Sequence, residues 1–175
     1  GRDLSSRRTH QRRGDVPGGC GHGVGLAHHG GRLAQQDHWH AADTGPSVSQ
    51  PTVSERLMLA REAIQKKEWR KALAELNVAA KEEPRNADVH NLLGYSYRKQ
   101  ATPNLAKAFE HYNTALKLDP KHKGAHEYIG EAYLMDKKPA EAEKHLVELE
   151  KICGNKTCEE YADLSAAITK YKAAK

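Results

Sequence analysis

The sequence predicts an all-α fold: a solenoid of three stacked helical hairpins, closed by a carboxyl-terminal capping helix and preceded by a disordered tail. Three observations predict it. The composition changes abruptly near residue 50, an amphipathic segment recurs three times after that point, and prolines separate successive copies of this segment. Aromatic residues form only 6% of the 175-residue chain, which argues against a large β-sandwich. No apolar run approaches the roughly 18 residues that a membrane-spanning helix needs.

Residues 1–50 are expected to be disordered. They contain most of the glycines and histidines but no lysine, glutamate or isoleucine, whereas the rest of the chain is rich in lysine and glutamate. Neither a helical nor a strand period organises their few apolar residues, so they cannot bury enough surface to offset chain entropy. At most a short helix is expected, at residues 33–42.

Three alternatives to a merely disordered tail stay open. Arginine without lysine or glutamate is what a GC-rich gene yields when it is read out of frame, so a non-native tail and a lost export signal are one interpretation. Phosphate or nucleic-acid contact through Arg7, Arg8, Arg12 and Arg13 is another, although the net charge of +5 is too small and too dispersed to require it. Zinc or copper binding is the third, but the spacing fits no standard site. Its candidate ligands are Cys20, His22, His28, His29, His38 and His40.

Residues 53–156 divide into three segments with the same pattern. A small residue stands eight places into each segment, and an alanine recurs in each second half. A proline marks the turn at the end of the first and of the second segment, because proline is tolerated in a helix only near its beginning. The segments are 53–86, 87–122 and 123–156, with small residues Ala60, Gly94 and Gly130, alanines Ala72, Ala108 and Ala142, and prolines Pro84 and Pro120.

The three segments resemble tetratricopeptide repeats, a family of helix–turn–helix units of about 34 residues. The resemblance rests on LGYSY at residues 93–97, IGEAY at 129–133 and ALKLDP at 115–120. It implies that the hairpins stack into a right-handed superhelix whose concave surface is lined by the first helix of each repeat. Repeat two departs from the pattern by two extra residues near 101–104, which should lengthen its internal turn. Repeat three ends in Gly154 in place of a proline.

Gly94 and Gly130 are expected to be structural rather than ligand-binding residues. Glycine inside a helix costs about 1 kcal/mol relative to alanine, so something must require the missing side chain. Two antiparallel helices approach most closely where their side chains are smallest, and overpacking such a contact costs about 1–3 kcal/mol. We therefore expect Gly94 to lie against the second helix of its repeat near Ala108, and Gly130 to lie likewise near Ala142.

Residues 157–175 are predicted to form the capping helix. Apolar residues recur there at intervals of three and four, and lysines occupy the opposite side, as in a terminal solenoid element with one polar face. Thr157 is expected to cap the start of this helix. Glu159 and Glu160 then fall in its first turn, where the helix dipole favours acidic groups.

Cys153 and Cys158 bracket the turn before this helix. Two thiols are too few for a structural zinc site, and their C-x4-C spacing differs from the redox C-x-x-C motif. Two interpretations stay open: a disulfide that ties the last repeat to the cap, or two ordinary thiols. A disulfide would add about 2 kcal/mol of stability on the loop-entropy model. It would also indicate export to an oxidising place such as a periplasm, with the cytoplasm as the alternative.

The concave surface implied by the resemblance is the predicted binding groove for a peptide. An asparagine can both donate to and accept from a peptide backbone, an arginine can bind a carboxylate, and a tyrosine offers an amphipathic contact. A merely solvated polar face is the competing interpretation. The predicted groove residues are Arg61, Asn91, Tyr95, Arg98, Lys99, Glu127, Tyr128 and Glu131.

The resemblance also suggests one partner that this groove does not fit. Some members of the family grip chaperone carboxyl termini through a clamp of basic residues. Only one of the matching positions is basic here, so we do not expect that partner. These positions are Leu57, Arg61, Leu92, Gly124 and Tyr128.

The expected function is that of a non-enzymatic protein-interaction module or adaptor, with a peptide or protein partner of unknown identity. Residues 51–175 show no nucleophile–base pair and no metal triad, so no catalytic residue, metal or cofactor is predicted. His90 and His126 occupy equivalent places in their repeats, which indicates packing rather than chemistry. The histidines of this part look scattered and show no pairing typical of metal ligands: His90, His111, His122, His126 and His145. The alternatives are a self-associating scaffold or assembly factor and, less favoured, nucleic-acid or metal binding through the tail.

Overall fold

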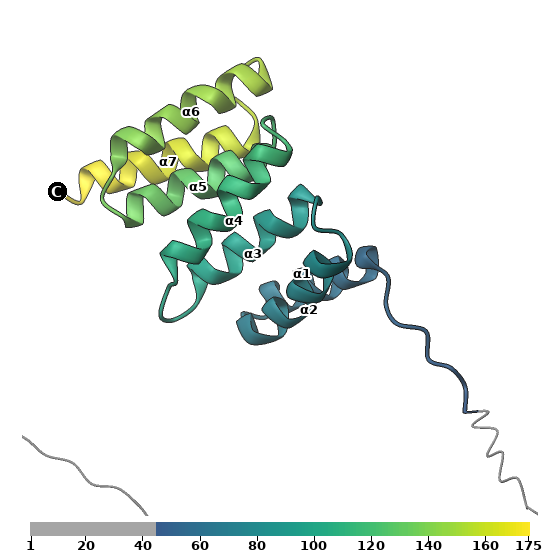
Figure 1. Cartoon of the computed structure of the whole chain (residues 1–175). Helices are drawn as coiled ribbons and strands as arrows, with labels where there is room; N and C mark the ends of the chain where they lie inside the picture. The colour runs from purple at the N-terminus through teal and green to yellow at the C-terminus, as the bar shows by residue number, and fades with distance from the viewer. Residues whose placement is uncertain (1–44) are drawn as a thin grey trace, which may run out of the picture. The chain divides into compact units, whose positions relative to one another are not determined.

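A computed structural model describes residues 45–175, and this part of the chain is built from helices alone (Figure 1). Three helical hairpins are followed by a further helix, which confirms the predicted all-α solenoid with its cap. Most of the predicted disordered tail lies outside the described residues. The helices are α1 (Val53–Gln65), α2 (Trp69–Glu82), α3 (Ala87–Lys99), α4 (Leu105–Leu118), α5 (Lys123–Met135), α6 (Pro139–Cys153) and α7 (Glu159–Ala173).

The hairpins stack through neighbouring helices. The pairs α1–α2, α3–α4 and α5–α6 form the hairpins, α2 also packs on α3, and α4 packs on α5. The capping helix α7 packs against both α5 and α6 (Figure 1). Because α3 also contacts α5 directly, α3, α5 and α7 follow one another on the same side of the stack. Among the described residues, none of the helices is both long enough and apolar enough to cross a membrane.

Polar side chains set the start of the first helix but not that of the last. The Glu55 amide donates to the Thr52 hydroxyl oxygen at 3.2 Å, and the Thr52 amide donates to the Glu55 carboxylate at 3.3 Å, which together form a capping box. The predicted cap at Thr157 is wrong. Its amide and its hydroxyl both donate to the side chain of Asn155, and Cys158 takes the N-cap position of α7 without a side-chain bond.

The turn inside the second hairpin is longer than its counterparts, as predicted from the two extra residues. It spans residues 100–104, whereas the equivalent turns span 66–68 and 136–138. The shorter turns place Lys67 and Lys137 in the left-handed region, with φ of 57° and 58°. This conformation is unfavourable for residues that carry a Cβ. In the longer turn, by contrast, every residue has a negative φ.

Gly94 lies at a close helix contact within the second hairpin. A Cβ at this position would come within 2.6 Å of the ring of Tyr112, which is the largest of the fully buried side chains. The prediction named Ala108 as the neighbour, but the Tyr112 ring, one helical turn further along α4, is the nearest group. The small residues Ala72, Ala108 and Ala142 are themselves completely buried.

Gly130 contacts the capping helix, whereas the prediction placed it against Ala142. A Cβ at Gly130 would come within 2.7 Å of both methyl groups of Leu164, which belongs to α7. Side-chain atoms almost never approach so closely, so a Cβ here would force either the Leu164 side chain or α7 itself to shift. Gly130 is therefore the point at which α7 docks on α5.

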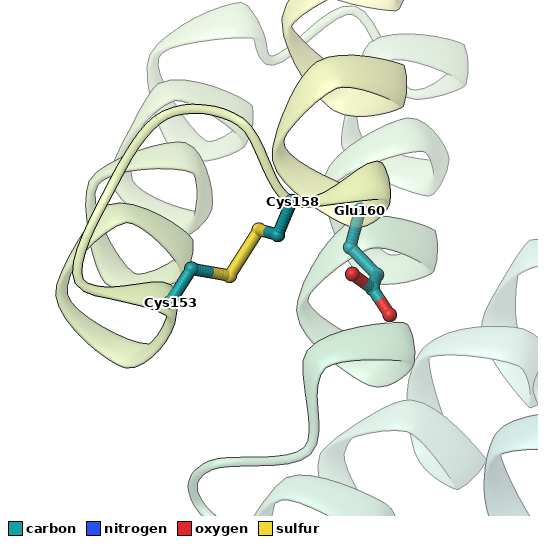
Figure 2. A group of neighbouring side chains, drawn as sticks. All are labelled: Cys153, Cys158 and Glu160. Carbon is teal, nitrogen blue, oxygen red and sulfur yellow. A yellow bond between two sulfur atoms is a disulfide. The ribbon is translucent and has the colours of Figure 1, made fainter.

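Cys153 and Cys158 form a disulfide, so the structure contains the first of the two arrangements considered for them (Figure 2). Cys153 is the last residue of α6 and Cys158 immediately precedes α7, with their Cα atoms 6.3 Å apart. The intervening turn begins at Gly154, whose φ of 71° lies in the left-handed region that glycine adopts readily. The cross-link fixes the start of α7 to the end of α6.

Candidate functional site

A cleft of about 300 Å³ opens on the side of the stack where the first helices of the hairpins meet the cap. Its walls come from α1, α3, α5 and α7, so all three hairpins contribute to it. Most of its polar groups are carboxylates. The lining residues are Arg61, Asp88, Asn91, Leu92, His122, Gly124, Glu127, Tyr128, Glu159, Glu160 and Asp163.

Asn91 is the most unusual polar group of this cleft. Its side chain is 6% exposed, and its Oδ1 atom is buried without a hydrogen-bond partner among the described residues. An unsatisfied buried carbonyl costs about 1–3 kcal/mol. Gly124 lies beside it, because a Cβ there would come within 3.1 Å of Asn91 Nδ2. The missing side chain at Gly124 therefore leaves room next to the amide.

Glu127 places a nearly buried carboxyl group in the same cleft, with 8% of its surface exposed. Burial raises its pKa, and the neighbouring carboxylates of Glu131, Asp163 and Glu160 raise it further, against an opposing effect of Arg98. The resulting pKa is about 8. Glu127 is therefore mostly protonated at neutral pH, and a cation beside it would favour the ionised form.

His122 ties two repeats together at the edge of the cleft. Its Nδ1 accepts from the Ala125 amide at 3.0 Å, so the ring proton is on Nε2, which donates to the Asp88 carboxylate at 2.6 Å. Asp88 is therefore engaged in a hydrogen bond with His122. None of the remaining cleft carboxylates lies within ion-pair distance of a basic side chain within residues 45–175.

Arg98 lies beside the cleft and is held inside the fold. Its side chain is 5% exposed, its guanidinium forms an ion pair with Glu131 at 2.6 Å, and its Nε donates to the Tyr112 hydroxyl at 3.3 Å. The guanidinium carbon also lies 5.4 Å and 5.7 Å from the ring centroids of Tyr95 and Tyr128. We therefore interpret Arg98 as a structural group and not as a free contact for a carboxylate.

The structure brings half of the predicted groove residues together. The four that line the cleft are Arg61, Asn91, Glu127 and Tyr128. The other four lie outside its lining, although three of them form the cluster around Arg98 just described. Lys99 is exposed near the end of α3, with its amine 5.9 Å from the ring centroid of Tyr95.

Sequence reasoning missed the contribution of the capping helix. The helix dipole was sufficient to explain why Glu159 and Glu160 stand in the first turn of the capping helix, and no role was predicted for Asp163. The only signal was the density of acidic residues in CEEYAD at residues 158–163. The density of acidic residues does not predict which surface they line. The packing of α7 against α5 places them in the lining of the cleft.

Four of the five histidines that looked scattered form two equivalent pairs, so they are not isolated from one another. Nδ1 of His90 lies 3.1 Å from Nδ1 of His111, and Nδ1 of His126 lies 2.9 Å from Nδ1 of His145. Each pair joins the first helix of a hairpin to the second helix of the same hairpin. The signal in the sequence was that both members recur in consecutive repeats.

The hydrogen bonds of the second pair fix its protons. A carbonyl oxygen can only accept, so Nε2 of His126 donates to the carbonyl of Pro120 at 2.7 Å. Nδ1 of His126 is then unprotonated and accepts from Nδ1 of His145. Burial and the facing His126 ring lower the pKa of His145 to about 4, and the ring of Tyr133 stacks on it. The first pair repeats the arrangement with the carbonyl of Pro84.

Cys153, Cys158 and Glu160 are the one set of three potential metal ligands whose atoms lie within 4.8 Å of one another in residues 45–175. Figure 2 shows the two sulfur atoms joined in the disulfide, with the Glu160 side chain beside it. Disulfide sulfurs offer no thiolate, so this set does not fit a metal ion in its present oxidation state. It acts instead as an anchor for the acidic first turn of α7.

The outer face of α1 carries the most exposed large hydrophobic side chain of any helix in the described region. Met58 is 69% exposed, and Leu59, next to it, is 37% exposed. Together with Pro51 they line a shallow hollow of about 580 Å³. No other helix covers this side of α1 within residues 45–175.

Comparison with known proteins agrees with this architecture. A family model described as tetratricopeptide repeat matches residues 57–122 and 103–153. The chain belongs to the tetratricopeptide repeat family. Its three hairpins are therefore tetratricopeptide repeats. No curated protein sequence matches the chain.

Several solved structures share the fold of this tetratricopeptide repeat protein. The TPR2B domain of yeast Sti1, in its pHsp70 complex, superposes with a TM-score of 0.62 at 17% identity, covering 70% of this chain and 98% of that one. The type III secretion translocator chaperone SycD of Yersinia enterocolitica gives 0.60 at 20% identity, covering 73% and 94%. The first TPR of Spaghetti (RPAP3), bound to the HSP90 peptide SRMEEVD, gives 0.58 at 17% identity, covering 70% and 94%.

Proposed function

We propose that residues 45–175 act as a non-enzymatic protein-interaction module that holds an extended segment of a partner protein in the cleft. The observation that carries this proposal is the buried Oδ1 of Asn91, which lacks a partner within these residues, in a cleft lined by every hairpin. An N–H group of a bound peptide would supply the missing hydrogen bond. The family supports the same function, since yeast Sti1 and Spaghetti present this fold in complexes with pHsp70 and an HSP90 peptide.

The lining of the cleft favours binding over catalysis. It contains no serine, threonine, cysteine or lysine that could act as a nucleophile. Its single histidine, His122, is held by Asp88 and by a backbone amide. The remaining groups are carboxylates, an amide, a phenol and one arginine, which suit recognition of polar groups.

Partner capture from native extract, with the full chain as bait, tests the proposal. Asn91→Leu removes the buried acceptor, and Arg61→Ala removes the cleft arginine. Lys117→Ala, on the exposed side of α4 away from the cleft, is the matched control for the lost positive charge. The test combines Asn91→Leu and Arg61→Ala in one double variant. A protein retained by the wild type and the control but lost with this double variant would support the proposal. Equal retention by all three baits would exclude a role for the cleft.

Self-association is a second candidate function, favoured by the exposed apolar face of α1. Met58 and Leu59 together form a contact surface that a second copy of the chain could cover. Light scattering tests it across a concentration series. A dimer that dissociates on Met58→Asp would support this function, whereas a monomer at every concentration would exclude it.

We also propose that the protein works in an oxidising compartment such as a periplasm. The Cys153–Cys158 disulfide supports this location, because such bonds persist mainly outside the reducing cytosol. Rapid alkylation of thiols in intact cells, followed by mass analysis of the native protein, tests it. Unmodified Cys153 and Cys158 are the expected result, and their full alkylation would favour the cytoplasm.

A further inference from the structure

The cleft carries an unbalanced negative charge. Five carboxyl groups line it, but Glu127 is mostly protonated at neutral pH and Asp88 is bonded to the neutral ring of His122, so the charge comes chiefly from α7 and is opposed by one arginine. The histidine is already engaged by Asp88, which leaves the carboxylates of α5 and α7 without a basic partner in the described part of the chain. These belong to Glu127 of α5 and to Glu159, Glu160 and Asp163 of α7. A ligand with positive charge would balance them.

The carboxylates are spread too widely for one metal ion. A metal site needs several ligand atoms around a common point, about 2.0–2.6 Å from the ion. Within residues 45–175, the sole set of three candidate ligands that converges in this way is the disulfide pair with Glu160. An organic cation with several N–H donors, in contrast, can contact separated carboxylates at once.

We propose that the cleft binds an arginine side chain of the partner segment, with its guanidinium held by the Asn91 carbonyl and by the carboxylates of Glu127 and Asp163. The inference rests on the proposed function, because it names the chemical class of the segment that the cleft holds. A guanidinium presents five N–H donors in a planar fork that matches carboxylates. One of these donors satisfies Asn91 Oδ1, which has no partner among the described residues.

Lysine satisfies the same groups less well. Its ammonium is a compact point charge whose three donors share one atom, whereas the donors of a guanidinium are spread over three nitrogen atoms. The cleft groups come from α3, α5 and α7. A planar, wider cation can therefore reach more of these groups at once.

The protein already holds one guanidinium in this way, next to the cleft. Arg98 is bound by the Glu131 carboxylate, by the Tyr112 hydroxyl and by the faces of Tyr95 and Tyr128. The proposed ligand would lie in the cleft itself. The carboxyl group of Glu127, the carbonyl oxygen of Asn91 and the same Tyr128 form part of its lining. Both sites offer a carboxylate and Tyr128 to a guanidinium, but Arg98 occupies the first one from within the fold.

A titration with blocked pentapeptides tests the inference on the full, isotope-labelled chain. The probe is acetyl-Gly-Ser-Arg-Ser-Gly-amide, and the comparison peptides carry lysine, citrulline or glutamate in place of the arginine. Citrulline has the shape of arginine without its charge. The expected result is a saturable change in the amide signals of Asn91 and Gly124 with the arginine peptide. Lysine should bind more weakly, and citrulline should not bind.

Two double variants separate the local charge of the cleft from the charge of the whole protein. Glu160→Gln with Asp163→Asn removes two cleft carboxylates and should weaken the arginine peptide roughly tenfold or more. Glu110→Gln with Glu148→Gln makes the same change in net charge on exposed residues outside the cleft, and should leave the affinity unchanged. The dispersion of the amide spectrum shows that each variant is folded.

The outcomes distinguish this inference from the proposed function. Equal binding of the arginine and citrulline peptides, equal loss in both double variants, or no saturable change with the arginine peptide would each overturn the inference. If the glutamate peptide alone shifted Asn91 and Gly124, the cleft would still be a peptide site of the opposite charge preference. Partner capture that depends on Asn91, without any arginine binding, would likewise leave the proposed function standing alone.

Discussion

His126 and His145 are joined through their Nδ1 atoms, which lie 2.9 Å apart, and one proton occupies the space between them. The bond links α5 to α6 and is anchored to the turn before α5 through the carbonyl of Pro120. A second proton cannot enter this contact without placing two donors against each other. The pair is therefore stable in its neutral form and sensitive to acid.

Acid should destabilise the protein through this pair. The pKa of His145 falls from its ordinary 6.5 to about 4 in the folded protein, because of burial and then the facing His126. Between these two values the unfolded chain binds the proton more readily, so the free energy of unfolding declines as the pH falls from 6.5 toward 4. Below about 4 both states are protonated and this decline ends. Urea midpoints measured across the interval check it.

His145→Gln is the matching variant for the acid experiment. A glutamine amide can still donate to Nδ1 of His126 but does not titrate. The variant should therefore show a shallower loss of stability over the same pH interval than the wild type. Identical pH profiles would mean that the pair does not control the acid response.

Replacing Gly130 should undock the capping helix. The Cβ of Gly130→Ala would meet the methyl groups of Leu164, and we expect a loss of about 1–3 kcal/mol in the free energy of unfolding. Hydrogen exchange in α7 should accelerate more than in α1. Gly124→Ala is the control, since its Cβ would overlap less, with Asn91 Nδ2 at 3.1 Å and the His122 ring at 3.4 Å. Equal effects of the two substitutions would contradict the role of Gly130 as the docking point.

Loss of the disulfide should lower stability and weaken the cleft together. Cys153→Ser with Cys158→Ser is expected to cost about 2 kcal/mol of unfolding free energy. Because the bond fixes the first turn of α7, the variant should also bind the arginine peptide more weakly. Cys20→Ser, which removes the third cysteine of the chain, should change neither quantity. Lower stability with unaltered peptide affinity would show that the cross-link does not position the acidic turn.

Affinity for the arginine peptide should rise with pH. The pKa of Glu127 is about 8, and a bound cation would lower it, so binding below this pH must release a proton. Affinity should therefore increase as the pH approaches about 8 and level off above it. Titration calorimetry in buffers of different ionisation enthalpy would detect the released proton. Glu127→Gln should remove both the pH dependence and the proton release.

Asn91→Leu should separate binding from stability. Removing an unsatisfied buried carbonyl relieves a cost of about 1–3 kcal/mol, so the variant should be as stable as the wild type or more so. The same variant should lose affinity for the arginine peptide. Asn113→Leu, on the exposed side of α4, is the control and should alter neither property greatly. A strongly destabilised Asn91→Leu would indicate that its amide has a structural role.

The repeat pattern was sufficient to predict the fold because each hairpin is specified locally. Pro84 and Pro120 end one unit and begin the next, and the small residues at equivalent places mark where helices meet. The longer second turn could be inferred in the same way, from the two extra residues. Each unit contacts only its neighbours, so the same packing recurs from one repeat to the next. The architecture therefore follows from the pattern of a single repeat.

The neighbours of particular side chains depended on the docking of α7, which no repeat pattern specifies. Gly130 contacts Leu164 instead of a group in its own hairpin, and Asp163 becomes part of the cleft, for the same reason. The burial of Arg98 was missed because its partner Glu131 lies in the following repeat. Contacts between repeats and with the cap carry most of the candidate site, and they could not be derived from amphipathic periodicity.

The two ends of the stack differ in a way that gives the protein a direction of growth. The outer face of α1 presents Met58 and Leu59 with no covalent bond across it, so a further hairpin could be joined before Val53 and bury them. At the other end, α7 already packs against Gly130 of α5, and the Cys153–Cys158 bond fixes its start. A hairpin added by design before Val53 would therefore leave these contacts and the disulfide intact.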